Sequence, residues 1–129
     1  MRIRLTFVLL MASGCASGTT APPATPTSSV TAAAPAGLVI TITAAGVTPK
    51  QLVVSRGAQV TFVNNDSITH LMFSDPHPDH TDCPELNQVG FLDPGQTRQS
   101  GNLNTTRTCG FHDHNLFANT SLQGSITIQ

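Results

Sequence analysis

Apolar and polar residues alternate from Leu38 onward, as they do in a β-strand whose two faces differ. Leu38, Ile40 and Ile42 fall on one face of this segment, and residues 39, 41 and 43 fall on the other. Short runs rich in Val, Ile, Thr or Phe follow at residues 51–55, 58–63, 71–73, 88–92, 97–103, 107–111 and 124–128. The pattern predicts a strand in each of these runs.

Turn-forming residues separate the predicted strands, at residues 48–49, 56–57, 64–66, 93–95 and 102–105. No window has a helical period over a helical length. Seven to eight short strands at this spacing predict an all-β fold, an antiparallel Greek-key β-sandwich with one core. The residues expected inside this core are Val53, Val60, Phe62, Ile126 and Ile128.

One stretch interrupts the strand pattern. Residues 75–85 contain Pro76, Pro78 and Pro84 among many polar side chains. Proline cannot donate to a strand ladder, so we expect a long ordered loop here.

The first residues of the 129-residue chain differ from the rest. Arg2 and Arg4 precede an apolar run at residues 5–11 that is too short to cross a bilayer, and we expect residues 1–14 to be a signal peptide. Residues 12–15 resemble a bacterial lipobox, which implies lipidation of Cys15 after cleavage. An ordinary signal peptide cut near Ala12 or Ala16 is the alternative.

Residues 15–37 are mostly Ala, Thr, Ser and Pro without charge, and we expect them to be a disordered linker behind the lipidated N-terminus. The globular domain is then residues 38–129. These features predict an exported lipoprotein, membrane-anchored and facing the periplasm or the cell exterior. We expect it to be a monomer.

Net charge narrows the choice of partners. The chain carries a formal charge of -1, and removal of Arg2 and Arg4 leaves four basic against seven acidic side chains. An acidic domain argues against a nucleic-acid partner.

All five histidines lie in the second half of the chain, at predicted strand ends or in loops. Metal sites need imidazoles from different elements that converge on one point. His70 follows the turn after the strand ending at residue 63, and Cys109, His112 and His114 lie where a late strand is expected to end. We expect these positions to meet at one end of the sandwich.

The order of these features resembles the cupredoxins, the blue-copper family that includes plastocyanin and azurin. The resemblance covers residues 37–129. Residues 49–54, Gly57, residues 60–66 and His70 are similar to the first half of the family. Residues 93–96, Cys109 with His112, and residues 122–128 are similar to its second half.

The resemblance implies one copper ion held by a cysteine thiolate and two histidines, with a weak axial ligand. The implied ligands are His70, Cys109 and one of His112 and His114, because the family spaces its second histidine either three or five residues after the cysteine. The implied function is a type 1 copper single-electron carrier outside the cytoplasm, with a redox partner that the sequence does not name.

The axial ligand departs from the family, since no methionine follows Cys109. Asn119 could present an amide oxygen in its place. Met72 is a second candidate, although its short apolar run also fits a core position.

Cys83 offers a different outcome for Cys109. Two cysteines in an oxidising compartment favour a disulfide, and a Cys83–Cys109 bond would consume the thiolate. A nitrogen-only site would then draw on His70, His112 and His114, with His77 or His80 as accessory ligands. Residues 77–83 could equally form a plain polar loop, a lid from which Cys83 or one of the histidines reaches the copper as an accessory ligand, or a separate metal site.

The sequence therefore leaves three alternative hypotheses for the function. The first is the electron carrier, and we expect no enzyme activity because no nucleophile–base pair or phosphate-binding glycine loop is present in the sequence. The second is a copper storage or handling module with a nitrogen-rich site. The third is a disulfide-bonded cupredoxin-like domain with a structural or partner-binding role.

Overall fold

A computed structural model describes residues 37–129, so the expected signal peptide, Cys15 and nearly all of the expected linker lie outside the described residues. This part contains nine strands and two short 3-10 helices. The elements are β1 (Val39–Thr43), β2 (Gly46–Thr48), β3 (Gln51–Val54), β4 (Thr61–Asn64), β5 (His70–Ser74), η1 (Leu86–Gln88), β6 (Gly90–Leu92), β7 (Thr97–Gln99), β8 (Arg107–Asp113), η2 (Thr120–Leu122) and β9 (Gly124–Ile128).

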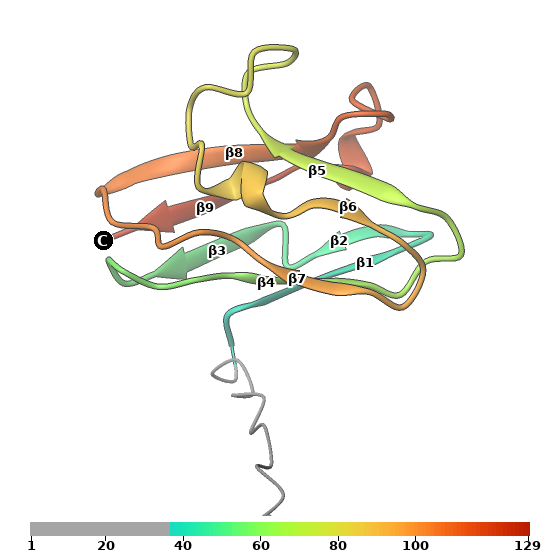
Figure 1. The fold of residues 1–129 in the computed structure, drawn as a ribbon, viewed down its shortest axis with the longest axis horizontal. Coiled ribbons are helices and arrows are strands. Elements are labelled where there is room, and N and C mark those ends of the chain that lie inside the picture. Colours follow the sequence, from blue (N-terminus) through green and yellow to red (C-terminus); the bar gives the residue numbers. More distant parts are fainter. Residues whose placement is uncertain (1–36) are drawn as a thin grey trace, which may run out of the picture. The chain divides into compact units, whose positions relative to one another are not determined.

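The strands form two sheets that pack as a sandwich (Figure 1). One sheet has the order β2-β1-β4-β7, and the other has the order β3-β9-β8-β5-β6. The predicted β-sandwich is therefore confirmed. Within residues 37–129, no helix is long and apolar enough to cross a membrane.

The topology differs from the prediction in two respects. The three-residue strand β2 was not predicted, because a segment of that length carries too little alternation to be recognised. Two strand pairs, β1 with β4 and β3 with β9, are parallel rather than antiparallel. In each case the chain changes sheets between the two partners, so they are not joined by a hairpin.

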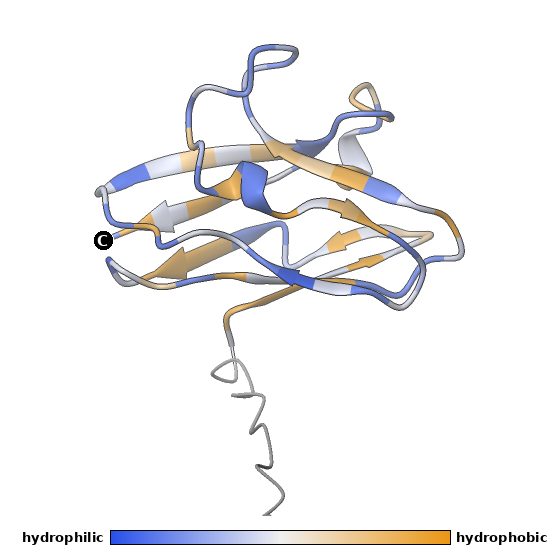
Figure 2. Ribbon diagram, viewed as in Figure 1, coloured by the Kyte–Doolittle hydropathy of each residue, from blue (hydrophilic) through white to orange (hydrophobic). Residues whose placement is uncertain are grey.

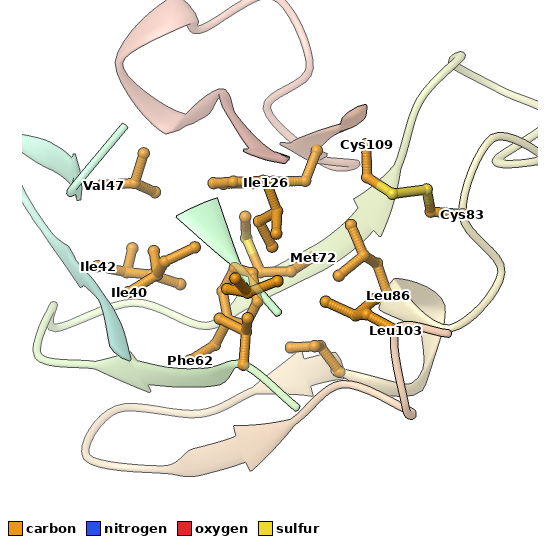
Figure 3. Packing of buried hydrophobic residues seen from close by; sticks show 14 of the residues in the cluster. Ile40, Ile42, Val47, Phe62, Met72, Cys83, Leu86, Leu103, Cys109 and Ile126 are labelled. Atoms are coloured by element: carbon orange, nitrogen blue, oxygen red, sulfur yellow. A yellow bond between two sulfur atoms is a disulfide. The ribbon is translucent and has the colours of Figure 1, made fainter. Parts of the chain in front are cut away.

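Buried side chains from both sheets fill the space between the layers (Figure 3). Val60, Phe62, Ile126 and Ile128 are buried as predicted. Val53 was predicted wrongly and is 56% exposed, because alternation along β3 turns its neighbour Val54 inward instead. Figure 2 shows hydrophobic residues on the strands and mostly hydrophilic residues in the loop at the top of the view.

That loop, residues 75–85, joins β5 to η1 without forming a strand or a helix, as predicted. It passes over the sheet that contains β5 and β8 (Figure 1). The strand β8 below it runs to Asp113, two residues past its predicted end, because Asp113 pairs with Met72 of β5. This extra length decides where the histidines lie.

Candidate metal centre

Alternation along β8 divides its side chains between the two faces of the sheet. Cys109, Phe111 and Asp113 share the face toward the core, and all three are at most 1% exposed. His112 lies on the opposite face, and His114 follows it two positions later, with its backbone N–H bonded to the carbonyl of Leu71. Side chains two residues apart in extended chain point the same way, so both imidazoles face the overlying loop.

The loop brings two more imidazoles to this face. His77, His80, His112 and His114 each offer one ring nitrogen, and these four atoms all lie within 4.8 Å of one another. We call this set the four-histidine cluster. Its members come from two segments more than thirty residues apart in the sequence, so only the fold brings them together.

His112 is the most buried member, with a side chain that is 3% exposed. Its Nδ1–H donates to Oδ1 of Asp75 across 2.6 Å, because an ionised carboxylate can only accept. Its other nitrogen, Nε2, is buried and has no hydrogen-bond partner. A buried nitrogen left without a partner is costly unless a ligand satisfies it.

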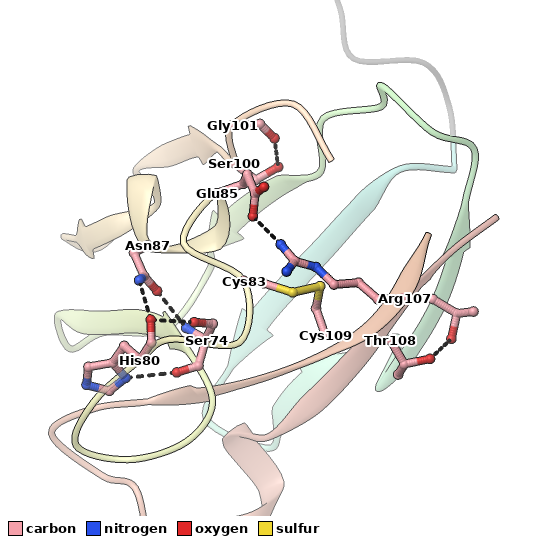
Figure 4. The surroundings of a disulfide bond; sticks show 11 residues. Ser74, His80, Cys83, Glu85, Asn87, Ser100, Gly101, Arg107, Thr108 and Cys109 are labelled. Atoms are coloured by element: carbon pink, nitrogen blue, oxygen red, sulfur yellow. Dashed lines mark hydrogen bonds and ion pairs between the residues drawn. A yellow bond between two sulfur atoms is a disulfide. The ribbon is translucent and has the colours of Figure 1, made fainter. Parts of the chain in front are cut away.

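His80 is fixed by contacts around residue 74. Its Nδ1–H donates to the carbonyl of Ser74 at 2.8 Å, and its own carbonyl accepts bonds from the hydroxyl of Ser74 and the amide of Asn87 (Figure 4). The backbone of His80 has a φ of 52°, a left-handed conformation that is uncommon outside glycine. These bonds leave Nε2 of His80 2.8 Å from Nδ1 of His114.

Aromatic rings line the cluster. The His77 ring stacks on the ring of Phe117, with ring centroids 4.2 Å apart. The ring centroid of Phe73 lies 4.7 Å from that of His80 and 5.7 Å from that of His114. Burial lowers the pKa of His77, and the positive charge that the other three imidazoles can carry lowers it further. His77 therefore favours its neutral form, which is the form that binds metals.

A disulfide joins the two segments that carry the cluster. Cys83 follows His80 by three residues, and Cys109 precedes His112 by three; their Cα atoms are 5.8 Å apart. Figure 4 shows the bond beside the ion pair of Arg107 with Glu85, whose atoms lie 2.7 Å apart. The structure thus contains the Cys83–Cys109 disulfide, which the sequence offered as the alternative to a copper thiolate.

This bond corrects the expectation that Cys109 is a copper thiolate. Its sulfur is bonded to that of Cys83, and its side chain faces the core while His112 and His114 face the opposite side of the sheet. The expected set failed because it assumed that the strand ends at residue 111. An odd separation in a continuous strand places the cysteine and the histidines on opposite faces.

His70, the expected first ligand, is not a member of the four-histidine cluster. Its Nδ1 is 2.7 Å from Asp113 and its Nε2 is 3.2 Å from Asp66, so both ring nitrogens already face carboxylates. The backbone N–H of Ser67, and to a smaller degree His70, lowers the pKa of Asp66. Its carboxylate is thereby kept ionised beside His70.

The two axial candidates have other roles in the structure. Met72 is 1% exposed and belongs to the core between the sheets. The side-chain oxygen of Asn119 accepts bonds from the backbone N–H and the hydroxyl of Ser121, which caps η2. Neither residue joins the four-histidine cluster.

The cluster fits a metal ion by the chemistry of its donors. Neutral imidazoles suit Cu, Zn, Fe and Ni, and a metal-bound histidine usually donates its other N–H to a carboxylate or a carbonyl. His112 makes such a bond to Asp75, and His80 makes one to Ser74. Sequence reasoning missed Asp75, whose role becomes visible only when the loop is folded onto β8.

No protein-family model matches the chain, and no curated protein matches it. Solved structures do. A purple cupredoxin from Nitrosopumilus maritimus is 19% identical, with a TM-score of 0.55 over 70% of this chain and 98% of that one. Oxidized plastocyanin from Dryopteris crassirhizoma is 17% identical, with a TM-score of 0.54 over 70% of this chain and 99% of that one. A Cu(I) amicyanin mutant is 17% identical, with a TM-score of 0.57 over 76% of this chain and 87% of that one. Residues 37–129 therefore have the cupredoxin fold.

Proposed function

We propose that this protein binds one copper ion through His77, His80, His112 and His114 and handles copper outside the cytoplasm. The buried Nε2 of His112 carries the proposal, since it has no protein partner and His112 contributes a ring nitrogen to the four-histidine cluster. Copper bound there would satisfy that atom. In the neutral ring, the hydrogen bond to Asp75 places the proton on Nδ1, so that Nε2 carries the lone pair that a metal can bind.

Copper is favoured over other metals for two reasons. Among divalent ions of the first transition row, Cu²⁺ binds a given nitrogen site most tightly. Two of the structural neighbours are also described with a redox or metal state, as an oxidized plastocyanin and a Cu(I) amicyanin. Zinc is the main competitor, because imidazoles suit it as well.

The disulfide favours copper handling over a type 1 electron carrier. Soft thiolate and thioether ligands select Cu(I), and among the described residues Cys83, Cys109 and Met72 are occupied by the disulfide or the core. A set of imidazoles alone favours Cu(II). Reduction to Cu(I) would weaken the site and release the ion, which suits storage or transfer.

Electron transfer is the second candidate. It is favoured by the hydrogen bonds that fix His80 and His112, because ligands that move little lower the cost of changing oxidation state. The two roles differ in a measurable way. Voltammetry of the copper-loaded protein gives a reversible wave for a carrier, whereas a handling module loses its copper when it is reduced.

Copper binding itself is tested by titration of the purified protein with Cu²⁺ and with Zn²⁺, followed by calorimetry. The expected result is one tightly bound Cu²⁺ per chain and weaker binding of Zn²⁺. Absence of saturable Cu²⁺ binding would refute the proposal.

Export and lipid anchoring form part of the same proposal. They are supported by Arg2, Arg4 and the apolar run before Cys15, and by the disulfide, since disulfides persist in oxidising compartments. Mass spectrometry of the protein isolated from membranes should find a diacylated N-terminal cysteine, and Cys15→Ser should release the protein from the membrane fraction.

A further inference from the structure

We propose that Asp75 is a positioning residue for the copper site and that Gly110 exists as glycine to admit its carboxylate. The inference rests on the proposed function. It adds a residue outside the four ligands on which the affinity for copper depends.

Asp75 contacts His112 directly. Oδ1 of Asp75 lies 2.6 Å from Nδ1 of His112, at the end of β5 where the loop begins. This bond selects the tautomer with the proton on Nδ1. It leaves Nε2, which is buried without a partner, as the nitrogen of His112 that can bind a metal. Loss of such an outer partner lowers metal affinity about 10–100-fold.

The backbone of Asp75 is held by two hydrogen bonds. Its N–H donates to the carbonyl of Gly110 at 3.1 Å, and its carbonyl accepts from the N–H of Asp82 at 2.9 Å. The backbone of Asp75 is thus bonded both to β8, which carries His112, and to the loop that carries His77 and His80. Asp75 therefore links β8 to the loop, the two segments that carry the four-histidine cluster.

Gly110 is an isolated glycine in the middle of β8. Glycine weakens a strand interior, so its presence there often marks a close approach by another group. A Cβ at residue 110 would collide with Oδ2 of Asp75 and would lie 2.8 Å from its Cγ. An alanine at this position would push the carboxylate away from His112.

The test compares Asp75→Ala and Gly110→Ala with the unchanged protein and with Asp79→Asn as the matched control. Asp79 lies in the same exposed loop, and its change to Asn removes the same charge without removing a hydrogen bond to a histidine; the charge of Asp79 acts on His77 only by raising its pKa, as the smallest of the causes that act on it. Cu²⁺ affinity is measured by competition with a chelator. Nitrogen-15 NMR of the copper-free protein reports which nitrogen of His112 carries the proton.

The expected result is a loss of about 10–100-fold in Cu²⁺ affinity for Asp75→Ala and no more than a small change for Asp79→Asn. The copper-free variant should show His112 as a mixture of tautomers, which a purely structural role would not produce. Gly110→Ala should reduce affinity when Asp75 is present and add nothing in Asp75→Ala, because the two share one contact.

An unchanged affinity and an unchanged His112 tautomer in Asp75→Ala would overturn the inference. This outcome is separate from failure of the proposed function, which would appear as absence of Cu²⁺ binding in the unchanged protein. Additive losses for Asp75→Ala and Gly110→Ala would likewise contradict the role given to Gly110.

Discussion

Histidines lie on both faces of the sheet that contains β5 and β8, and the two faces use them differently. On the inner face, His70 is fully buried and each of its ring nitrogens meets a carboxylate, that of Asp66 or that of Asp113. On the outer face, the four-histidine cluster gathers ring nitrogens within 4.8 Å of one another, and one of them is buried without a partner.

This difference shows what makes a histidine a metal ligand. The place of His70 in the chain fits a ligand position, but its nitrogens are already satisfied by the protein. His112 has one nitrogen held by Asp75 and one left for a ligand. An available lone pair that converges with others is a stronger indicator than sequence order.

The largest effect is expected from removal of ligands on the outer face. In the double variant His80→Ala and His112→Ala, two of four donors are absent, so the loss of Cu²⁺ affinity should exceed the roughly 100-fold upper range for an outer partner. Calorimetric titration measures this loss. Retention of tight binding by the folded double variant would show that the cluster is not the site.

His70→Ala tests the inner face. It leaves Oδ2 of Asp113 buried without its histidine partner, and a buried acceptor left unsatisfied costs about 1–3 kcal/mol of unfolding free energy. Urea denaturation measures this loss, and His70→Gln, which keeps one donor, should lose less. Copper stoichiometry should stay at one ion in whichever variant remains folded; a folded His70 variant without copper would place His70 in the site.

The disulfide affects the outer face through the loop. The double variant Cys83→Ala and Cys109→Ala frees a loop closed over 26 residues, and the entropy of that closure corresponds to about 3.5 kcal/mol of unfolding free energy. Copper affinity should fall too, because His77 and His80 lose their covalent tie to β8. Urea denaturation measures the stability and chelator competition measures the Cu²⁺ affinity. If both were unchanged, the disulfide would not be what holds His77 and His80 near β8.

The smallest effect concerns pH. The pKa of His77 is lowered in the folded protein, so below the ordinary histidine value of 6.5 the unfolded chain binds more protons and the folded state loses stability. His77→Gln should therefore flatten the fall in stability of the copper-free protein as the pH drops below that value. Urea denaturation at a series of pH values measures it, and an identical fall in both proteins would remove His77 as a cause.

Alternation predicted most of the sandwich. It identified β1, β9 and the buried positions of Phe62 and Ile126, because these strands have one face in the core and one outside. It failed at Val53, where Leu52, Val53 and Val54 are all apolar and no alternation marks the inner face. It also missed β2, which is only three residues long.

The site was predictable only in part. The sequence supplied all four members of the cluster as candidates, together with the disulfide as one of two fates for Cys109. The choice between them depended on how far β8 continues, and this is set by its pairing with β5, which is a long-range contact. A strand continuing to residue 113 would have placed His112 and His114 together and Cys109 on the opposite face.

The central claim is that copper is held by imidazoles alone while Cys109 is disulfide-bonded. The most direct test is the absorption and electron paramagnetic resonance spectrum of the Cu(II)-loaded protein, recorded also for Cys109→Ser. The account predicts weak visible absorption and nitrogen hyperfine structure, both retained in any folded Cys109→Ser protein. An intense visible thiolate-to-copper band that disappears in Cys109→Ser would contradict it.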